Sequence, residues 1–166
     1  MTMWLVGMMG SGKTAAGRLA ASRLGVEFSD TDVVVAERMG CSVAQLWGDV
    51  GEAAFRELEK VATALLDRRG GIVSTGGGVV LDPANRAILG ESGQVVWLRA
   101  SPSVLSSRVG SNTGRPLMPE AGQLEVLEAL LEERSRFYEE VSAHQIDTDD
   151  MDVSEVAKAI EAVWNQ

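Results

Sequence analysis

The chain has 166 residues and a formal net charge of −9, with 45% hydrophobic and 23% charged side chains, which is the composition of one globular domain. A single cysteine excludes an internal disulfide, and the apolar run Met3–Val6 is far too short to span a bilayer, so we expect a cytoplasmic protein with no membrane segment. Residues 1–118 hold 12 basic and 11 acidic side chains and residues 119–166 hold 3 and 13, so no basic surface for nucleic acid is expected.

Short apolar runs alternate with longer amphipathic segments along the chain. The alternation predicts strands near residues 3–6, 26–29, 71–74, 94–98 and 144–146, with helices that include residues 13–24, 52–68, 124–141 and 153–164. Further helix starts are marked by a capping box at Ser42 and Gln45, and by Asp82 and Ser101, each of which precedes a proline. Strands that alternate with helices form a parallel sheet with helices on both faces. The sequence therefore predicts a single three-layer α/β domain over residues 1–166.

The first predicted strand runs into Gly7-Met8-Met9-Gly10-Ser11-Gly12-Lys13-Thr14, which matches the Gly-x-x-x-x-Gly-Lys-Ser/Thr phosphate loop at every fixed position. Glycines let backbone N–H groups wrap a phosphate chain, and the helix that follows adds the partial positive charge of its N-terminus. Lys13 is expected to hold the β- and γ-phosphates and Thr14 to ligate Mg²⁺. Because strand, motif and helix coincide, the loop predicts a nucleotide site.

A nucleotide site does not define the reaction. No run of the form Asn/Thr-Lys-x-Asp occurs, which argues against a GTPase. The third strand runs into Ser74-Thr75-Gly76 without a carboxylate, which argues against an oligomeric ATPase. At this length little chain remains outside the nucleotide core, and this favours a compact kinase that binds its second substrate within the same domain.

Three further motifs are candidates for the acceptor site. Asp30 and Asp32 follow the second strand on a loop, where one carboxylate can stand near Mg²⁺ and the other can accept a hydrogen bond from an acceptor hydroxyl; helix capping is the alternative interpretation. Arg56 and Glu59 are one helical turn apart, a spacing that by itself usually indicates an exposed ion pair. Gly76-Gly77-Gly78 allows a ligand to approach the backbone closely, or forms a simple turn.

In their order and spacing these motifs resemble the shikimate kinase family over essentially the whole chain. The elements that carry the resemblance are Gly10-Ser11-Gly12-Lys13-Thr14, Asp30-Thr31-Asp32, Phe55-Arg56 with Glu59, Gly76-Gly77-Gly78, Arg115-Pro116-Leu117, and Arg134 four residues before Tyr138. The family transfers the γ-phosphoryl group of ATP to the 3-hydroxyl of shikimate, a step toward chorismate and the aromatic amino acids. The resemblance implies this activity, with ATP and Mg²⁺, on a sheet of strand order 2-3-1-4-5.

The resemblance also implies roles for individual residues. Those implied to bind the nucleotide are Gly10, Ser11, Gly12, Lys13, Thr14, Ala15, Arg108 and Arg115. Those implied to bind shikimate are Asp32, Arg56, Gly77, Gly78 and Arg134, with the two arginines on its carboxylate. Thr14 and Asp30 would support Mg²⁺, and the implied catalytic residues are Lys13, Asp32 and Arg115. Substrate-binding helices are expected over about residues 31–68, and a lid that bears Arg115 over about residues 110–122.

One segment departs from the family pattern. Residues 147–152 read Asp-Thr-Asp-Asp-Met-Asp where many members place Arg or another polar residue near the adenine, which leaves the adenine contacts to the backbone or to Met151. Two alternatives to a shikimate kinase stay open: a kinase for another polyhydroxylated acid such as gluconate, and a nucleotide-binding regulatory module. We expect a monomer with a small-molecule acceptor.

Overall fold

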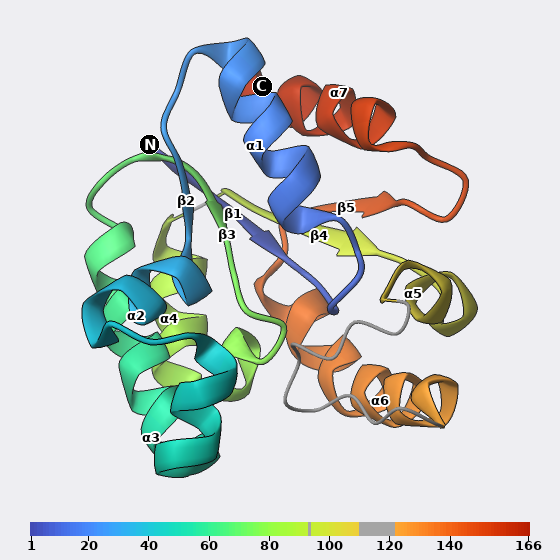
Figure 1. Ribbon diagram of the computed structural model, residues 1–166. Coiled ribbons are helices and arrows are strands. Elements are labelled where there is room, and N and C mark those ends of the chain that lie inside the picture. Colours follow the sequence, from blue (N-terminus) through green and yellow to red (C-terminus); the bar gives the residue numbers. More distant parts are fainter. Residues whose placement is uncertain (93, 110–121) are drawn as a thin grey trace.

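A five-stranded sheet forms the centre of the computed structural model, which describes residues 1–92, 94–109 and 122–166 (Figure 1). The strands are β1 (Thr2–Val6), β2 (Phe28–Asp30), β3 (Gly71–Ser74), β4 (Gln94–Arg99) and β5 (His144–Asp147). They lie in the order β2-β3-β1-β4-β5, and every neighbouring pair is parallel. The predicted α/β class and strand order are confirmed, and the predicted strands differ from the observed ones by at most two residues at either end.

Helices follow the strands and cover both faces of the sheet (Figure 1). They are α1 (Lys13–Leu24), α2 (Thr31–Met39), α3 (Val43–Leu66), α4 (Pro83–Ser92), α5 (Pro102–Val109), α6 (Gln123–Val141) and α7 (Val153–Trp164), with a short 3₁₀ helix, η1 (Val79–Leu81). The predicted capping box at the start of α3 is present, and α4 and α5 begin at their prolines as expected. Among the described helices, none combines the length and the apolar character needed to cross a membrane.

The central strand, β1, is buried on both faces. Met3 and Leu5 belong to the apolar cluster under α1 and α7, whereas Trp4 and Val6 belong to the cluster under η1, α4, α5 and α6. All four side chains are fully buried, as expected for a parallel strand that helices cover on both sides. A shift of this strand by one residue would exchange the two faces, and the different sizes of the side chains in the two clusters oppose it.

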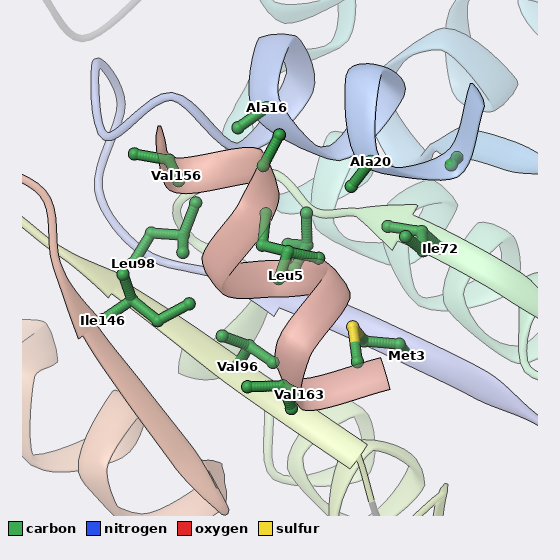
Figure 2. Packing of buried hydrophobic residues seen from close by; sticks show 13 residues of the cluster. Met3, Leu5, Ala16, Ala20, Ile72, Val96, Leu98, Ile146, Val156 and Val163 are labelled. Carbon is green, nitrogen blue, oxygen red and sulfur yellow. The ribbon is translucent and has the colours of Figure 1, made fainter. Parts of the chain in front are cut away.

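On one face of the sheet, α1 and α7 pack with side chains of different size (Figure 2). α1 contributes the small side chains of Ala16 and Ala20, which let its backbone lie close to the strands, and α7 contributes Val156 and Val163. Native interiors are close-packed, so this arrangement leaves α1 little freedom to shift along the sheet. The N-terminus of α1 is thereby held beside the end of β1.

The longest helix, α3, contains a kink at Gly51. This residue has φ 79° and ψ 173°, inside a segment whose other residues are helical. A positive φ of this size carries no steric cost for glycine, so Gly51 joins two helical segments in different directions. The sequence predicted the two parts by separate signals, a capping box at Ser42 for the first and an apolar pattern over residues 52–68 for the second.

The segments that leave β1, β2 and β3 meet at one edge of the sheet. Parallel strands place their carboxyl ends along the same edge, which is where ligands bind in open α/β sheets. Residues 7–12 follow β1, Asp30 ends β2, and residues 75–78 follow β3. Because β2, β3 and β1 are neighbours, the fold brings the phosphate loop, the acidic pair and the glycine turn together.

Candidate active site

Two adjoining cavities lie at this edge. The phosphate cavity, about 440 Å³, is lined by the phosphate loop, the start of α1, Asp30 and Arg108. The side cavity, about 130 Å³, is lined by residues of α3, the glycine turn and Arg134. Residues common to both cavities are Met9, Asp32, Gly76 and Gly77. A group that binds in one cavity therefore lies next to a group that binds in the other.

The phosphate loop depends on glycine at three positions. Gly7, Gly10 and Gly12 have φ values of 142°, 82° and 91°, which L side chains rarely adopt. A Cβ at Gly7 would also lie 2.5 Å from the carbonyl oxygen of Leu98. α1 begins at Lys13 without a side chain that caps its N-terminus, so the first N–H groups of the helix and its partial positive charge are left for a ligand. The loop thus has the backbone of an anion site.

The side chain of Lys13 folds back onto the phosphate loop. Its Nζ donates hydrogen bonds to the carbonyl oxygens of Gly7 and Met8, each at 2.8 Å, and only 7% of the residue is exposed. The same side chain lines the phosphate cavity. The ammonium charge is therefore held at the wall of that cavity, where the sequence places a phosphate ligand.

Three oxygen atoms from three elements meet beside the phosphate loop. Thr14 Oγ1 donates a hydrogen bond to Asp30 Oδ2 at 2.9 Å and lies 3.2 Å from Ser74 Oγ. Mg²⁺ prefers oxygen ligands and is commonly held by one or two protein groups together with waters and substrate phosphates. Within residues 1–92, 94–109 and 122–166 there is no group of three or more His, Cys, Asp or Glu residues that could hold a metal. The donor set therefore fits an ion that is shared with a phosphate.

The two carboxylates of the Asp30-Thr31-Asp32 motif have different positions. Asp30 is the last residue of β2, and its Oδ1 accepts a hydrogen bond from the backbone N–H of Asp32 at 3.0 Å, which caps α2. The capping interpretation is thus right for Asp30, which bonds to Thr14 as well. The expected loop position is wrong for Asp32, because α2 begins directly after β2 and Asp32 lies in its first turn.

Asp32 is a buried carboxyl group with a perturbed pKa. Burial, followed by the negative charges of Asp30 and Glu59, raises the pKa of Asp32 from its ordinary value of 3.8 to about 6, and the positive charges of Lys13 and Arg56 oppose this rise. Its Oδ1 is buried and accepts no hydrogen bond from any described residue. A carboxyl group that titrates near neutral pH at the junction of two cavities is suited to accept a proton or a hydrogen bond from a ligand.

Arg56 and Glu59 form an ion pair in the wall of the side cavity. Arg56 Nη1 lies 2.8 Å from Glu59 Oε2, and Nη2 donates to Glu52 Oε1 at 3.2 Å. Glu59 is fully buried, so the exposed pair that the spacing alone indicates is wrong here. Burial raises the pKa of Glu59, and Arg56 and then Arg134 oppose the rise. The two carboxylates hold the guanidinium group of Arg56 in a fixed plane.

Arg134, on α6, lines the side cavity together with Arg56 of α3. It is 2% exposed, and its Nε is buried without a hydrogen bond to any described residue. The ion pair that it forms with Glu133 is long, at 3.8 Å. A buried guanidinium group whose Nε donor has no hydrogen-bond partner among the described residues suits a carboxylate ligand. The structure thus brings Arg56 and Arg134, which the family resemblance assigns to one carboxylate, into one cavity.

The glycine turn, residues 76–78, separates these charged groups. A Cβ at Gly78 would overlap the guanidinium group of Arg56, and one at Gly76 would lie 2.6 Å from Glu59 Oε1. At Gly77 the nearest atoms would be 3.5 Å away, which is ordinary contact. A Cβ at position 76 or 78 would therefore displace charged side chains that form the site, whereas the close approach expected at Gly77 would have to come from a ligand.

An aromatic wall completes the side cavity, and sequence analysis did not assign it to the site. The rings of Trp47 and Phe55 have centroids 5.1 Å apart, and the guanidinium carbon of Arg56 lies 5.3 Å from the centroid of Trp47. One signal in the sequence could have found this wall: residues 47, 55 and 59 are separated by eight and then four positions, a spacing that places side chains on one face of a helix. The kink at Gly51 obscures that periodicity.

Arg108 and the segment after β5 border the phosphate cavity. Arg108 Nη1 donates to Thr148 Oγ1 at 2.9 Å, and Nη2 donates to the carbonyl oxygens of Thr148 and Met151. Met151 lines a further cavity with Gly12, Arg108 and other residues next to the phosphate loop. Arg115, with the predicted lid up to residue 121, lies outside the described residues.

The comparisons with known proteins agree with this geometry. The family model described as Shikimate kinase matches residues 9–164 of the chain. The chain belongs to the shikimate kinase family. A shikimate kinase from Stenotrophomonas maltophilia is 41% identical over 146 residues, which are 87% of this chain and 81% of that protein. The structure titled shikimate kinase from Acinetobacter baumannii in complex with shikimate has a TM-score of 0.94 at 32% identity and covers 99% of this chain and 92% of its own.

Membership of the shikimate kinase family makes the chain a kinase, which confirms the predicted family and enzyme class and excludes a module without catalysis. A gluconokinase structure from Sinorhizobium meliloti 1021 has a TM-score of 0.59 at 21% identity, and covers 99% of this chain and 91% of its own. That likeness shows a common fold alone. The family members thus resemble this chain in sequence and fold, whereas the gluconokinase resembles it in fold only.

Proposed function

We propose that this chain transfers the γ-phosphoryl group of ATP to the 3-hydroxyl of shikimate. The observation that carries the proposal is the position of Asp32, which lines both cavities and has a buried oxygen without a hydrogen-bond partner among the described residues. An acceptor hydroxyl in the side cavity would lie between this carboxylate and the phosphate cavity. In-line transfer needs this adjacency of acceptor and γ-phosphate.

Arg56 and Arg134 would bind the shikimate carboxylate in the side cavity. Both are guanidinium groups at its wall, and each donates hydrogen bonds in a planar, fork-like geometry that matches a carboxylate. The N–H groups of Gly77 and Gly78 make no hydrogen bond to any described residue, so they are available to the acceptor as well. Arg56 is already paired with two carboxylates, whereas the ion pair of Arg134 with Glu133 is long, at 3.8 Å, so Arg134 in particular favours an acid over a neutral polyol as the acceptor.

In the phosphate cavity, Lys13 and the N–H groups of the phosphate loop would bind the β- and γ-phosphates. The loop supplies an anion site before the nucleotide arrives, so little reorganisation is needed when negative charge shifts toward the leaving phosphate. Thr14 and Asp30, with Ser74 beside them, would hold Mg²⁺. When bound, Mg²⁺ would supply neutralisation of phosphate charge.

Asp32 would orient the acceptor hydroxyl and accept its proton as the new bond to phosphorus forms. The carboxyl group must be ionised for this role, and with a pKa of about 6 it is mostly ionised at pH 7.5. Phosphoryl transfer through a loose transition state requires the hydroxyl to be positioned more than it requires full proton removal. Asp32 serves both needs, because it can hold the hydroxyl oxygen in line and take the proton later.

The adenine would lie in the cavity lined by Arg108 and Met151, next to the phosphate loop. Met151→Arg is expected to change the Kd for ADP by more than twofold, whereas Asp150→Arg, at an exposed position that does not line the cavity, should leave it within twofold. If neither variant changes the Kd, the adenine lies elsewhere. For Arg115, which the family resemblance makes a transition-state stabiliser, we expect Arg115→Ala to lower kcat more than ADP affinity.

We propose that the protein acts as a monomer, in the cytoplasm. Sedimentation equilibrium of the active protein tests the monomeric state, since the molar mass of a dimer would contradict it.

ADP release by the purified protein with Mg²⁺ and ATP tests the proposed activity, with shikimate, gluconate and no acceptor compared side by side. We expect turnover with shikimate alone. Turnover with gluconate alone would keep the phosphoryl-transfer chemistry and overturn the substrate. ATP binding without stimulation by either acid would contradict the proposal.

A further inference from the structure

Tyr138 is a buried tyrosine whose hydroxyl group reaches the glycine turn. The residue is fully buried on α6, and its ring lies against Trp97 of β4, with centroids 5.5 Å apart. Its hydroxyl donates a hydrogen bond to the carbonyl oxygen of Gly77 and lies 3.6 Å from the sulfur of Met8 in the phosphate loop. Tyr138 lines neither the phosphate cavity nor the side cavity. It therefore acts on the site through other residues.

The hydrogen bond to Gly77 fixes a peptide plane in the cavity wall. A peptide unit is planar and trans, so the carbonyl group of Gly77 and the N–H group of Gly78 point in opposite directions and turn together. A glycine pair resists such rotation less than other residues do, because no Cβ limits its φ and ψ angles. By fixing this peptide plane, the Tyr138 hydroxyl also fixes the direction of the N–H group of Gly78, and Gly78 lines the side cavity.

The same hydroxyl lies against Arg134, one helical turn earlier on α6. Burial raises the pKa of Tyr138, and the charge of Arg134 and a side-chain hydrogen bond with it oppose the rise. The phenol therefore keeps its proton at every pH at which the protein works, and it remains a donor to Gly77. Arg134 also approaches Gly77, since its Nη1 would lie 3.6 Å from a Cβ at that residue. Tyr138, Arg134 and Gly77 form one contact group behind the side cavity.

We propose that Tyr138 is a positioning residue for the acceptor: its hydroxyl group holds the Gly77–Gly78 peptide and the Arg134 guanidinium in the orientation that binds a carboxylate-bearing acceptor. This inference rests on the proposed function, because it assigns Gly78 and Arg134 to acceptor binding. A tyrosine that served only to fill the core would act through its ring, and its hydroxyl would be dispensable.

The test removes the hydroxyl and keeps the ring. In Tyr138→Phe the carbonyl of Gly77 loses its donor, and we expect the Kd for shikimate, measured by calorimetry, and its KM to rise about tenfold. The Kd for ADP and kcat should stay within about twofold, because the phosphate loop keeps the hydrogen bonds of Lys13 and loses only the long contact between the Tyr138 hydroxyl and the sulfur of Met8. Ser135→Ala is the matched control, since Ser135 is the next residue after Arg134 and, among the described residues, its hydroxyl bonds only to the Leu131 carbonyl of its own helix. Its constants should equal those of the parent.

A restored donor should restore binding. 4-Aminophenylalanine and 4-methylphenylalanine at position 138 have para groups of similar size, and only the first can donate to Gly77. We expect the amino variant to bind shikimate several-fold more tightly than the methyl variant. This pair also serves if Tyr138→Phe does not fold, because both variants fill the space of the lost hydroxyl.

Two outcomes would overturn the inference: shikimate affinity in Tyr138→Phe within twofold of the parent, or an equal loss of shikimate and ADP affinity, which a general structural role produces. Equal binding by the amino and methyl variants would overturn it too. The failure of the proposed function is distinct, because there the parent itself would show no binding of shikimate and no shikimate-dependent ADP release. In that case the role assigned to Tyr138 fails with it.

Discussion

Replacing Asp32 with asparagine is expected to stabilise the fold while it removes the kinase activity. Burial and neighbouring carboxylates raise the pKa of Asp32 from 3.8 to about 6, so the ionised form is disfavoured in the folded state. At 1.36 kcal/mol for each pKa unit, this shift costs the folded protein about 3 kcal/mol at pH 8. Asparagine has nearly the same shape and carries no charge, so Asp32→Asn should recover most of that free energy.

The dependence on pH has a definite sign. A carboxyl group whose pKa is raised on folding binds its proton more tightly in the folded state, so its stabilising contribution is present below pH 3.8 and is lost as the pH rises through about 6. The parent should therefore lose stability relative to Asp32→Asn across this window. Between pH 5 and pH 8 the difference between the two free energies of unfolding should grow by about 1 kcal/mol.

Urea denaturation of both proteins at pH 5 and pH 8, followed by circular dichroism, measures this difference. Asp49→Asn, at an exposed carboxylate of α3, is the control and should stay within about 0.5 kcal/mol of the parent at both pH values. A stability difference between parent and Asp32→Asn that is the same at pH 5 and pH 8 would refute the reasoning. An Asp32→Asn protein less stable than the parent at pH 8 would refute it more directly, because it would mean that the charge at position 32 stabilises the fold.

Four further predictions concern activity. In the parent, kcat/KM for shikimate should fall as the pH drops through about 6, because protonated Asp32 cannot accept the hydroxyl proton; a pH–rate profile flat down to pH 5 contradicts this role. Lys13→Ala should reduce turnover by at least about 10³-fold while calorimetry shows shikimate binding within twofold, and strong residual ADP release would remove Lys13 from the phosphate site. Arg134→Ala should raise the KM for shikimate about 10- to 100-fold through loss of a charge-assisted hydrogen bond, and an unchanged KM would show that the carboxylate binds elsewhere. Gly76→Ala should lower the free energy of unfolding by about 1–3 kcal/mol and lower kcat/KM, since its Cβ would lie 2.6 Å from a buried carboxylate oxygen. Gly90→Ala, which has open space around it, is the control and should leave the free energy of unfolding unchanged or raise it. Equal effects at both positions would contradict the packing that we describe.

Much of the fold followed from local signals in the sequence. The phosphate loop was predictable because its function is carried by consecutive residues, and its three positive-φ glycines are visible as glycines. The strand order followed from the family resemblance, whereas the alternation of strands and helices followed from the apolar pattern. β2 ends one residue later than predicted, because Asp30 both ends the strand and caps α2, and no irregular residue separates the two elements.

The electrostatics of the site could not be predicted, because burial depends on tertiary packing. The spacing of Arg56 and Glu59 allowed their ion pair to be predicted, but the spacing is the same for an exposed pair and for the buried pair observed. The raised pKa of Asp32 comes first from burial, then from the charge of Asp30, and then from the charge of Glu59, which is 27 positions away in the chain. The bond from Tyr138 to Gly77 spans 61 residues and leaves no local trace in the sequence.

The kink at Gly51 places the width of the side cavity under the control of a single backbone residue. Val43 and Trp47 come from the helical segment before the kink, and Phe55, Arg56 and Glu59 come from the segment after it, so opposite parts of one cavity wall turn about the torsion angles of Gly51. The ring contact between Trp47 and Phe55 joins the two segments across the kink, so a substitution that altered the torsion angles of Gly51 would change the shape of the cavity and this aromatic contact together.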